Sequence, residues 1–264
     1  MISRMQIRGA VWLAVCLLLI LVAVPALPGA PKLAMKVVRV GGDPDYRPMS
    51  FSDSSGKMIG YDVEFATKLL AARLGVPVKF EGMAWDGIIP ALQAGKIDML
   101  TQLVITDKRK AVVAFSKPYL TQIITSVVQA KRPNFNPGMN DLAGLKVGVQ
   151  VNTSASAALE KIPNVHPTTY NTVADEFSDL VLGRIDVVAM ESLGAGYTTK
   201  AVYPGKLRVT GQKLSTTPAL IAAAMRKQDT ALLAAVNAAI TAMLADGTLD
   251  KLNAKWFGNL KVTP

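Results

Sequence analysis

Residues 95–119 read GKIDMLTQLVITDKRKAVVAFSKPY and join a short apolar run to a charged turn. The apolar positions within residues 97–103 predict a buried strand, and the polar residues 106–109 predict a turn directly beyond it. In α/β sheets, ligand-binding groups usually lie beyond the carboxyl ends of strands. Arg109 at such a place can hold a carboxylate through two parallel hydrogen bonds. The alternative is that Arg109 is a solvated member of the basic run 108–110.

Strand and helix patterns alternate on the amino-terminal side of this stretch. The predicted elements are a strand at 36–41, a helix at 61–74 that stops at Gly75, a strand at 76–80 and a helix at 86–94. Alternation of this kind is typical of a mainly parallel sheet covered by helices, and it predicts an α/β fold.

The same alternation returns later in the chain. It predicts a strand at 146–150, a helix at 153–161, a strand at 165–170, and a helix at 173–182 that Thr172 caps with Asp175 three residues on. GRIDVV at 183–188 then resembles GKIDML at 95–100, and each follows an apolar helix. Two lobes built on one plan are the inference, with chance similarity as the alternative.

Two apolar stretches, QIITSVVQA at 122–130 and PALIAAAM at 218–225, flank the second unit. Both are long enough to cross between lobes as extended strands, and a pair of crossings makes a hinge. We therefore predict that lobe 1 comprises residues 36–121 and 218–264 and that lobe 2 comprises residues 122–217. Helices predicted at 229–245 and 248–256 would rejoin lobe 1. Ligands commonly lie in the cleft between such domains.

The amino terminus has the layout of a secretory signal peptide. Two arginines precede an apolar run at 11–24, which prolines and small residues follow. We predict a signal peptide over residues 1–30, cleaved near Ala26 or Ala30, and an exported mature protein. The alternative is an uncleaved membrane anchor, because the apolar run is close to the lower length for crossing a bilayer.

Composition excludes several kinds of chemistry. Cys16 lies within the predicted signal peptide and His166 is the sole histidine, so cysteine or histidine zinc sites and histidine-based triads are not expected. The net charge of +10 becomes +8 without the two arginines of the signal peptide, but the basic residues are scattered. A nucleic-acid-binding protein would more often carry a basic stripe with interleaved aromatic residues.

Several motifs in order along the chain resemble one family, the periplasmic solute-binding proteins that supply polar amino acids to ABC importers (bacterial extracellular solute-binding protein family 3). The motifs are DPDYRPMSF (43–51), IGYDVEFATKLLAARLG (59–75), GKIDML, ITDKRK (105–110), FSKPY (115–119), DLAGLKVGVQ (141–150), GRIDVVAM (183–190) and DGTLDKLNAKWFG (246–258). The resemblance implies two mainly parallel sheets joined by a two-strand hinge. It also implies a monomeric periplasmic protein without catalytic residues, metal or cofactor, whose partners are a small amino-acid-like ligand and an ABC permease.

The resemblance also implies roles for polar residues. Arg109 matches the family's arginine for the ligand α-carboxylate, and Glu191 matches an aspartate for the α-ammonium. Thr153 and Ser154 match further donors to the carboxylate at the start of a helix. Their alternative role is ordinary N-capping, and both roles are compatible.

Tyr46 and Trp85 match two walls that sandwich the ligand side chain in the family. The alternative for Trp85 is core packing, because it directly precedes Asp86, a predicted helix cap. Asp43 matches an acid near the far end of the ligand, where it could meet a cationic or amide group.

The chain departs from the family pattern beside Arg109. The segment 98–106 is one residue shorter than in the amino-acid binders, and Gln102 and Val104 replace small hydroxyl residues that usually contact the ammonium. The Val104 side chain cannot accept a hydrogen bond. The carboxylate site therefore stays an expectation, and the identity of the ligand stays open.

Two other function classes fit the same scaffold. A few relatives are periplasmic cyclohexadienyl dehydratases, which need a positioned general acid, and Glu191 and Asp43 are the candidate carboxyl groups. A sensor subunit that reports to a membrane partner is the third possibility.

Overall fold

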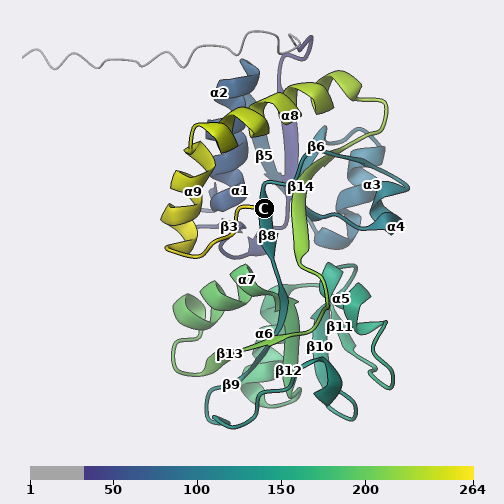
Figure 1. The fold of residues 1–264 in the computed structure, drawn as a ribbon, viewed down its shortest axis with the longest axis vertical. Coiled ribbons are helices and arrows are strands. Elements are labelled where there is room, and N and C mark those ends of the chain that lie inside the picture. The colour runs from purple at the N-terminus through teal and green to yellow at the C-terminus, as the bar shows by residue number, and fades with distance from the viewer. Residues whose placement is uncertain (1–32) are drawn as a thin grey trace, which may run out of the picture.

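The computed structural model describes residues 33–264 of the chain. The predicted signal peptide and Cys16 lie outside the described residues. The chain forms two lobes, each built around its own β-sheet with helices on the faces (Figure 1). The predicted two-lobed α/β fold is confirmed.

The first sheet has the strand order β5-β1-β6-β14-β7, and β8 also pairs with β14. Its strands are β1 (Val38–Gly42), β5 (Val78–Gly82), β6 (Met99–Val104), β7 (Ala114–Phe115), β8 (Leu120–Gln122) and β14 (Ala219–Met225). β1 is parallel to β5 and β6, whereas β14 is antiparallel to β6, β7 and β8. Val40, Leu100 and Ile221 are fully buried, so apolar burial holds this sheet in the core.

A small antiparallel sheet and several helices complete the first lobe. The sheet contains β2 (Asp45–Tyr46), β3 (Ser50–Ser52) and β4 (Met58–Ile59). The helical elements are α1 (Tyr61–Glu64), the π-helical η1 (Phe65–Leu70), α2 (Ala71–Leu74), the 3-10 helix η2 (Trp85–Gly87), α3 (Ile88–Gln93), α8 (Thr230–Ala245) and α9 (Thr248–Phe257). The first three span the predicted helix 61–74, which Gly75 ends at a φ of 68°. Helix α8 packs against α2 and β14.

The second sheet has the strand order β11-β10-β12-β9-β13. Its strands are β9 (Ile124–Gln129), β10 (Val147–Gln150), β11 (Thr168–Tyr170), β12 (Val187–Glu191) and β13 (Leu207–Lys213). The helical elements of this lobe are η3 (Met139–Asp141), α5 (Ser154–Leu159), α6 (Val173–Leu182), α7 (Ser192–Tyr197) and the π-helical η4 (Thr198–Val202). The predicted cap of α6 is confirmed, because the Thr172 side chain accepts a hydrogen bond from the Asp175 N–H.

The two similar motifs occupy equivalent places in the two sheets. Gly95 and Gly183 each follow a helix, and both glycines adopt the left-handed conformation, with φ of 72° and 74°. The aspartate of each motif accepts a hydrogen bond from a backbone N–H of the neighbouring parallel strand region, Arg39 for Asp98 and Lys146 for Asp186. Each carboxylate therefore ties together two adjacent segments, which gives the repeated sequence a structural reason.

Two extended segments connect the lobes (Figure 1). Only Ile123 separates β8 of the first sheet from β9 of the second, and residues 214–218 separate β13 from β14. The first lobe therefore contains segments that precede the second lobe in the sequence and segments that follow it.

Two local predictions were wrong, and some elements were not predicted. The predicted turn 106–109 is instead part of the short helix α4 (Asp107–Lys110), because Thr106 accepts a hydrogen bond from the Arg109 N–H and caps it. Asp86 caps no helix, because it lies inside η2, and the N-cap of η2 is Ala84. The small sheet and β13 were not predicted.

No single helix within residues 33–264 is long and apolar enough to cross a membrane. The pair α8 and α9 passes that criterion only together, across a bend of 76°.

Candidate functional site

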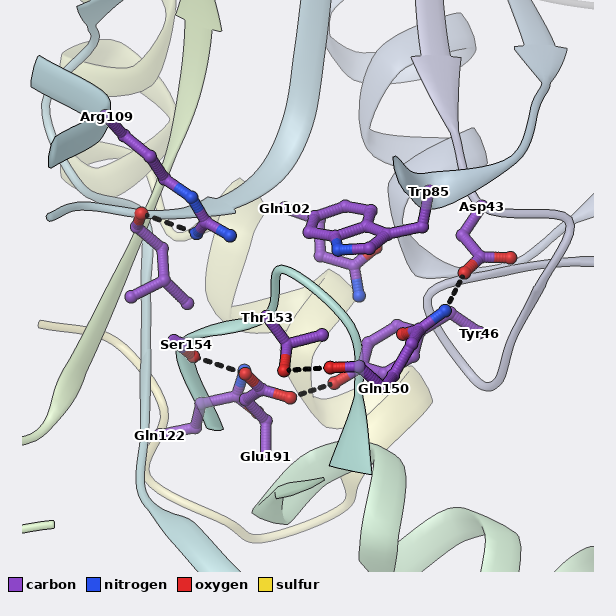
Figure 2. Close-up of a pocket in the computed structure, with 11 residues that line it drawn as sticks. Asp43, Tyr46, Trp85, Gln102, Arg109, Gln122, Gln150, Thr153, Ser154 and Glu191 are labelled. Carbon is purple, nitrogen blue, oxygen red and sulfur yellow. Dashed lines mark hydrogen bonds between the residues drawn. The ribbon is translucent and has the colours of Figure 1, made fainter. Parts of the chain in front are cut away.

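A pocket lies between the two lobes. Its lining brings together all nine residues that the sequence predicted for a ligand site, as Figure 2 illustrates, and adds two glutamines. The lining residues are Asp43, Tyr46, Trp85, Gln102, Val104, Arg109, Gln122, Gln150, Thr153, Ser154 and Glu191. Every one of them except the half-buried Trp85 is buried.

Arg109 enters the pocket from α4 and is 8% exposed. Its guanidinium donates to the carbonyl oxygens of Val104 at 3.0 Å and of Asn152 at 2.8 Å, and its carbon lies 5.7 Å from the centre of the Trp85 ring. Burial lowers the pKa of Arg109, and the negative charge of Glu191 opposes that shift. Among residues 33–264 no acidic side chain forms an ion pair with Arg109.

This environment suits an anion. A guanidinium has five N–H donors, and two carbonyl oxygens leave several of them available. A buried charge is costly unless a partner of opposite charge compensates it. A carboxylate entering the pocket would supply that partner to Arg109.

Glu191 ends β12 and lies on the opposite lobe. One of its oxygens accepts a hydrogen bond from the Tyr46 hydroxyl at 3.1 Å, and the other accepts one from the Ser154 hydroxyl. Tyr46 belongs to β2 of the first lobe, so its hydroxyl reaches across the cleft. Burial and the neighbouring Glu191 carboxylate raise the pKa of Tyr46 well above its usual range, so Tyr46 stays a neutral donor.

Thr153 caps α5, which is the alternative role considered from sequence. Its hydroxyl accepts from the Ser156 N–H at 3.1 Å and donates to the Gln150 carbonyl oxygen at 2.8 Å. The hydroxyl is therefore fixed in place at the edge of the pocket, next to Ser154. Thr153 therefore both caps α5 and lines the pocket.

Asp43 follows β1 and receives two hydrogen bonds. Gln150 Nε2 donates to one carboxylate oxygen at 2.8 Å, and the Asp45 N–H donates to the other at 2.9 Å. Burial raises the pKa of Asp43, and the bond from Gln150 partly opposes that effect. The bond from Gln150 is also a direct link between the lobes.

Outside the pocket, Asp45 makes another link between the lobes. Its second carboxylate oxygen accepts from the Ala174 N–H at 3.1 Å, at the start of α6, and Arg47 pairs with the first oxygen at 3.1 Å. Besides the contacts of the crossing segments, four polar contacts among residues 33–264 join the lobes at this cleft, so the lobes are closed on each other. The four contacts are Tyr46 with Glu191, Asp43 with Gln150, Arg109 with Asn152, and Asp45 with Ala174.

Two glutamines of the pocket, Gln150 and Gln122, were not predicted from the sequence. Gln150 is the last residue of β10, at the carboxyl end of a parallel strand, and that position could have identified it. Gln122 ends β8 at the crossing between lobes, and its side-chain oxygen accepts from the Leu193 N–H at 3.3 Å. No local pattern in the sequence marks Gln122.

Metal chemistry has no candidate centre in the described part of the chain. Residues 33–264 contain no group of three or more His, Cys, Asp or Glu side chains that could hold a metal ion. His166 is exposed in the loop before β11.

Comparisons with known proteins agree with this arrangement. The profile of the bacterial extracellular solute-binding proteins, family 3, matches residues 38–259. The L-cystine-binding protein TcyJ of Escherichia coli (strain K12) is 37% identical over 221 residues, covering 83% of this chain and 82% of the relative. The histidine-binding periplasmic protein of Escherichia coli (strain K12) is 32% identical over 235 residues, covering 83% and 87%.

A solved structure is similar over the same region. The ancestral amino acid-binding protein AncCDT-1, described as a precursor of cyclohexadienyl dehydratase, matches with a TM-score of 0.75 and 38% sequence identity. The match covers 84% of this chain and 95% of the other.

Proposed function

Because the chain belongs to the bacterial extracellular solute-binding proteins, family 3, we propose that it binds a small amino acid or amino-acid-like solute and delivers it to an ABC importer permease. The observation that carries the proposal is the buried Arg109, which forms no ion pair with any residue of 33–264, facing the buried Glu191 across one pocket. A cationic and an anionic group at two sides of a cleft complement the two charges of a free amino acid.

Each charged group has a defined task in this proposal. Arg109 holds the α-carboxylate through its free N–H groups, as a guanidinium does in bidentate pairs. Glu191 accepts hydrogen bonds from the α-ammonium, while Tyr46 and Ser154 keep its carboxylate in place. Asp43 and the Trp85 ring then meet the side chain of the solute.

The two lobes give the site a means of closing. A solute that contacts Arg109 on one lobe and Glu191 on the other binds the closed arrangement better than an open one. Only such a difference in contacts can shift the equilibrium between the two. We propose that the crossings at β8–β9 and β13–β14 form the hinge, with residues 36–121 and 218–264 as lobe 1 and residues 122–217 as lobe 2.

Delivery to a permease requires export. We propose that residues 1–30 direct the chain to the periplasm, and that the mature protein acts there as a monomer. The relatives named above, one of them a periplasmic binding protein, support this location.

A thermal-shift panel on the mature protein tests the function. The protein is first unfolded and refolded to remove bound solute, and is then mixed with the standard amino acids, L-cystine, polyamines and small carboxylic acids. A solute at 100 times its dissociation constant adds about 2.7 kcal/mol to the free energy of unfolding. That corresponds to about 5 to 10 °C for a chain of this size. Shifts confined to amino acids support the proposal, and no shift with any amino acid contradicts it.

A second candidate function is cyclohexadienyl dehydratase activity on the same scaffold. The similarity to a described precursor of that enzyme favours it, and Asp43, whose pKa burial raises, is a carboxyl group that could donate a proton. Incubation of the purified protein with arogenate and prephenate decides the matter. Turnover that is lost in Asp43→Asn would establish the enzyme, and absence of turnover would leave the binding protein.

A further inference from the structure

Gln102 has an unusual backbone within the first sheet. Its φ is 64°, a left-handed conformation that a residue with a β-carbon rarely adopts. Between the pairs Leu100–Ala224 and Leu103–Ala222 the register of β6 against β14 shifts, because β6 carries an extra residue there. Such bulges re-aim a side chain and are frequent beside functional sites.

The side chain that this bulge re-aims enters the pocket. Figure 2 shows the Gln102 amide below the Trp85 ring, pointing into the space between the lobes. Gln102 is 8% exposed, and its Nε2 has no hydrogen-bond partner among residues 33–264. An unmade hydrogen bond at a buried group is unfavourable, so an oxygen atom of a bound solute would offset it.

Two residues outside the pocket hold the bulge. The Gln102 N–H donates to the Tyr119 hydroxyl at 2.9 Å, and this hydroxyl lies 3.3 Å from Asp62 Oδ1, to which it donates. The Tyr119 ring is fully buried and stacks on Phe65 with the ring centres 4.3 Å apart. The phenol thus replaces the strand partner that the left-handed residue loses.

Asp62 is otherwise unexplained in the core. It is fully buried at the start of α1, and its Oδ2 has no partner in the described chain. Burial raises its pKa well above the usual range, and its Oδ1 accepts the hydrogen bond from the Tyr119 hydroxyl. Burial of a carboxyl group is costly unless its oxygens are hydrogen-bonded, and the Tyr119 hydroxyl supplies a hydrogen bond to one of them.

We propose that Asp62 and Tyr119 are positioning residues that hold the Gln102 amide in the pocket, where it hydrogen-bonds an oxygen atom of the bound solute. The second half of this inference, that the Gln102 side chain hydrogen-bonds the solute, rests on the proposed function. The first half, that the hydroxyl of Tyr119 fixes the bulge, concerns the protein without solute.

Hydrogen exchange of the Gln102 backbone N–H, followed by NMR, tests the first half. Tyr119→Phe removes the acceptor, and we expect exchange at Gln102 to become about tenfold faster, as the loss of one hydrogen bond allows. Tyr61→Phe is the matched control. Tyr61 is equally buried in the same lobe and donates to Asn253 at 2.9 Å, without a link to Gln102. Equal exchange at Gln102 in the wild type and Tyr119→Phe would overturn the proposal.

Asp62 is tested by two variants of the same residue. Asp62→Asn keeps an oxygen acceptor for the Tyr119 hydroxyl, and we expect exchange at Gln102 close to that of the wild type. Asp62→Ala removes the acceptor and should speed that exchange. Equal exchange in both variants would remove Asp62 from the proposal, whatever their overall stability.

A double-mutant cycle tests the second half, with L-arginine, L-histidine and L-cystine as titrants. Gln102→Gly accepts the left-handed conformation and removes the amide. We expect Tyr119→Phe to weaken binding about tenfold in the wild type and to have no further effect in Gln102→Gly. The same loss in both backgrounds would show that Tyr119 acts on general stability only, and would overturn the proposal. If none of the three solutes binds the wild type, the proposed function fails for them, and the exchange experiment alone decides the positioning role.

Discussion

The two sides of the pocket differ in how their polar groups are used. On the second lobe, Thr153 and Ser154 are engaged by neighbours, and Ser154 together with Tyr46 occupies both oxygens of Glu191. On the first lobe, Gln102 Nε2 and Trp85 Nε1 have no partner among the described residues, and Arg109 is unpaired by any acid there. The second lobe therefore offers a preformed surface, whereas the first offers donors that await acceptors.

This difference predicts where binding energy is concentrated. A solute meets open donors on the first lobe and gains hydrogen bonds that the closed protein lacks without it. On the second lobe it must share groups that are already satisfied. Substitution of the open donors on the first lobe should thus cost more affinity than substitution of the satisfied groups on the second.

The largest expected effect is that of Arg109→Ala. It should weaken binding of the solute found in the thermal-shift panel by about 2 to 5 kcal/mol, because truncation leaves the partner charge buried and unpaired. Isothermal titration measures the loss. Arg184→Ala is the control, because Arg184 is an exposed arginine paired with Asp179 on the second lobe. Unchanged affinity in Arg109→Ala would remove Arg109 from the site.

Glu191→Gln should come next, at about 1.5 to 3 kcal/mol, the range for a hydrogen bond to a charged group. The neutral amide loses the attraction to the α-ammonium and also disturbs the hydroxyls of Tyr46 and Ser154. Titration with the amino acid and with its analogue lacking the amino group separates the two contributions. A loss equal for both compounds would contradict a role in ammonium binding.

Glu176 in the core of the second lobe is an exception to this comparison, because its buried carboxyl group is not hydrogen-bonded within the described chain. Glu176 on α6 is 1% exposed, and neither side-chain oxygen has a partner within the described chain. Burial, and secondarily the charge of Glu191, raises its pKa well above the usual range. The folded state then holds more protons than the unfolded state between the two pKa values, so stability falls as pH rises through that window.

Glu176→Gln should remove the contribution of Glu176 to that pH dependence and make the protein more stable than the wild type at pH 7. Each unit by which a pKa is displaced is worth about 1.4 kcal/mol. Urea unfolding at a series of pH values above 4 measures the effect, with Glu160→Gln as an exposed control on the same lobe. A wild-type stability curve that stays flat while Glu176→Gln is no more stable would contradict the prediction.

The smallest effect is expected at the rim, where Asp45 meets the first turn of α6. Asp45→Asn removes the negative charge beside a helix N-terminus and should weaken solute binding by about 0.3 to 1 kcal/mol through easier opening. Salt should diminish the difference between variant and wild type. A loss as large as that of Arg109→Ala would mean that the rim, and not the pocket, dominates closure.

Much of the fold could be read from local sequence, and the exceptions have definite causes. The helix 173–182 and its cap at Thr172 were predicted because periodicity and capping are local. The turn 106–109 was misread because four residues carry too little periodicity to distinguish a turn from one capped helical turn. Gln150 was overlooked although it obeys the same strand-end rule as Arg109.

The sequence placed Arg109 beyond the end of a strand, where the carboxyl ends of parallel strands converge on one edge of a sheet, and its resemblance to the family implied Glu191 and the other residues of the site. It also identified the repeated plan of the two lobes through Asp98 and Asp186. Which donors stay open was settled by tertiary structure alone. The conformation of Gln102 depends on a bulge against β14 and on a hydroxyl 17 residues away, and the partners of Glu191 come from both lobes. Hydrogen-bond satisfaction is a property of groups that folding brings together from distant parts of the chain, and no local pattern contains it.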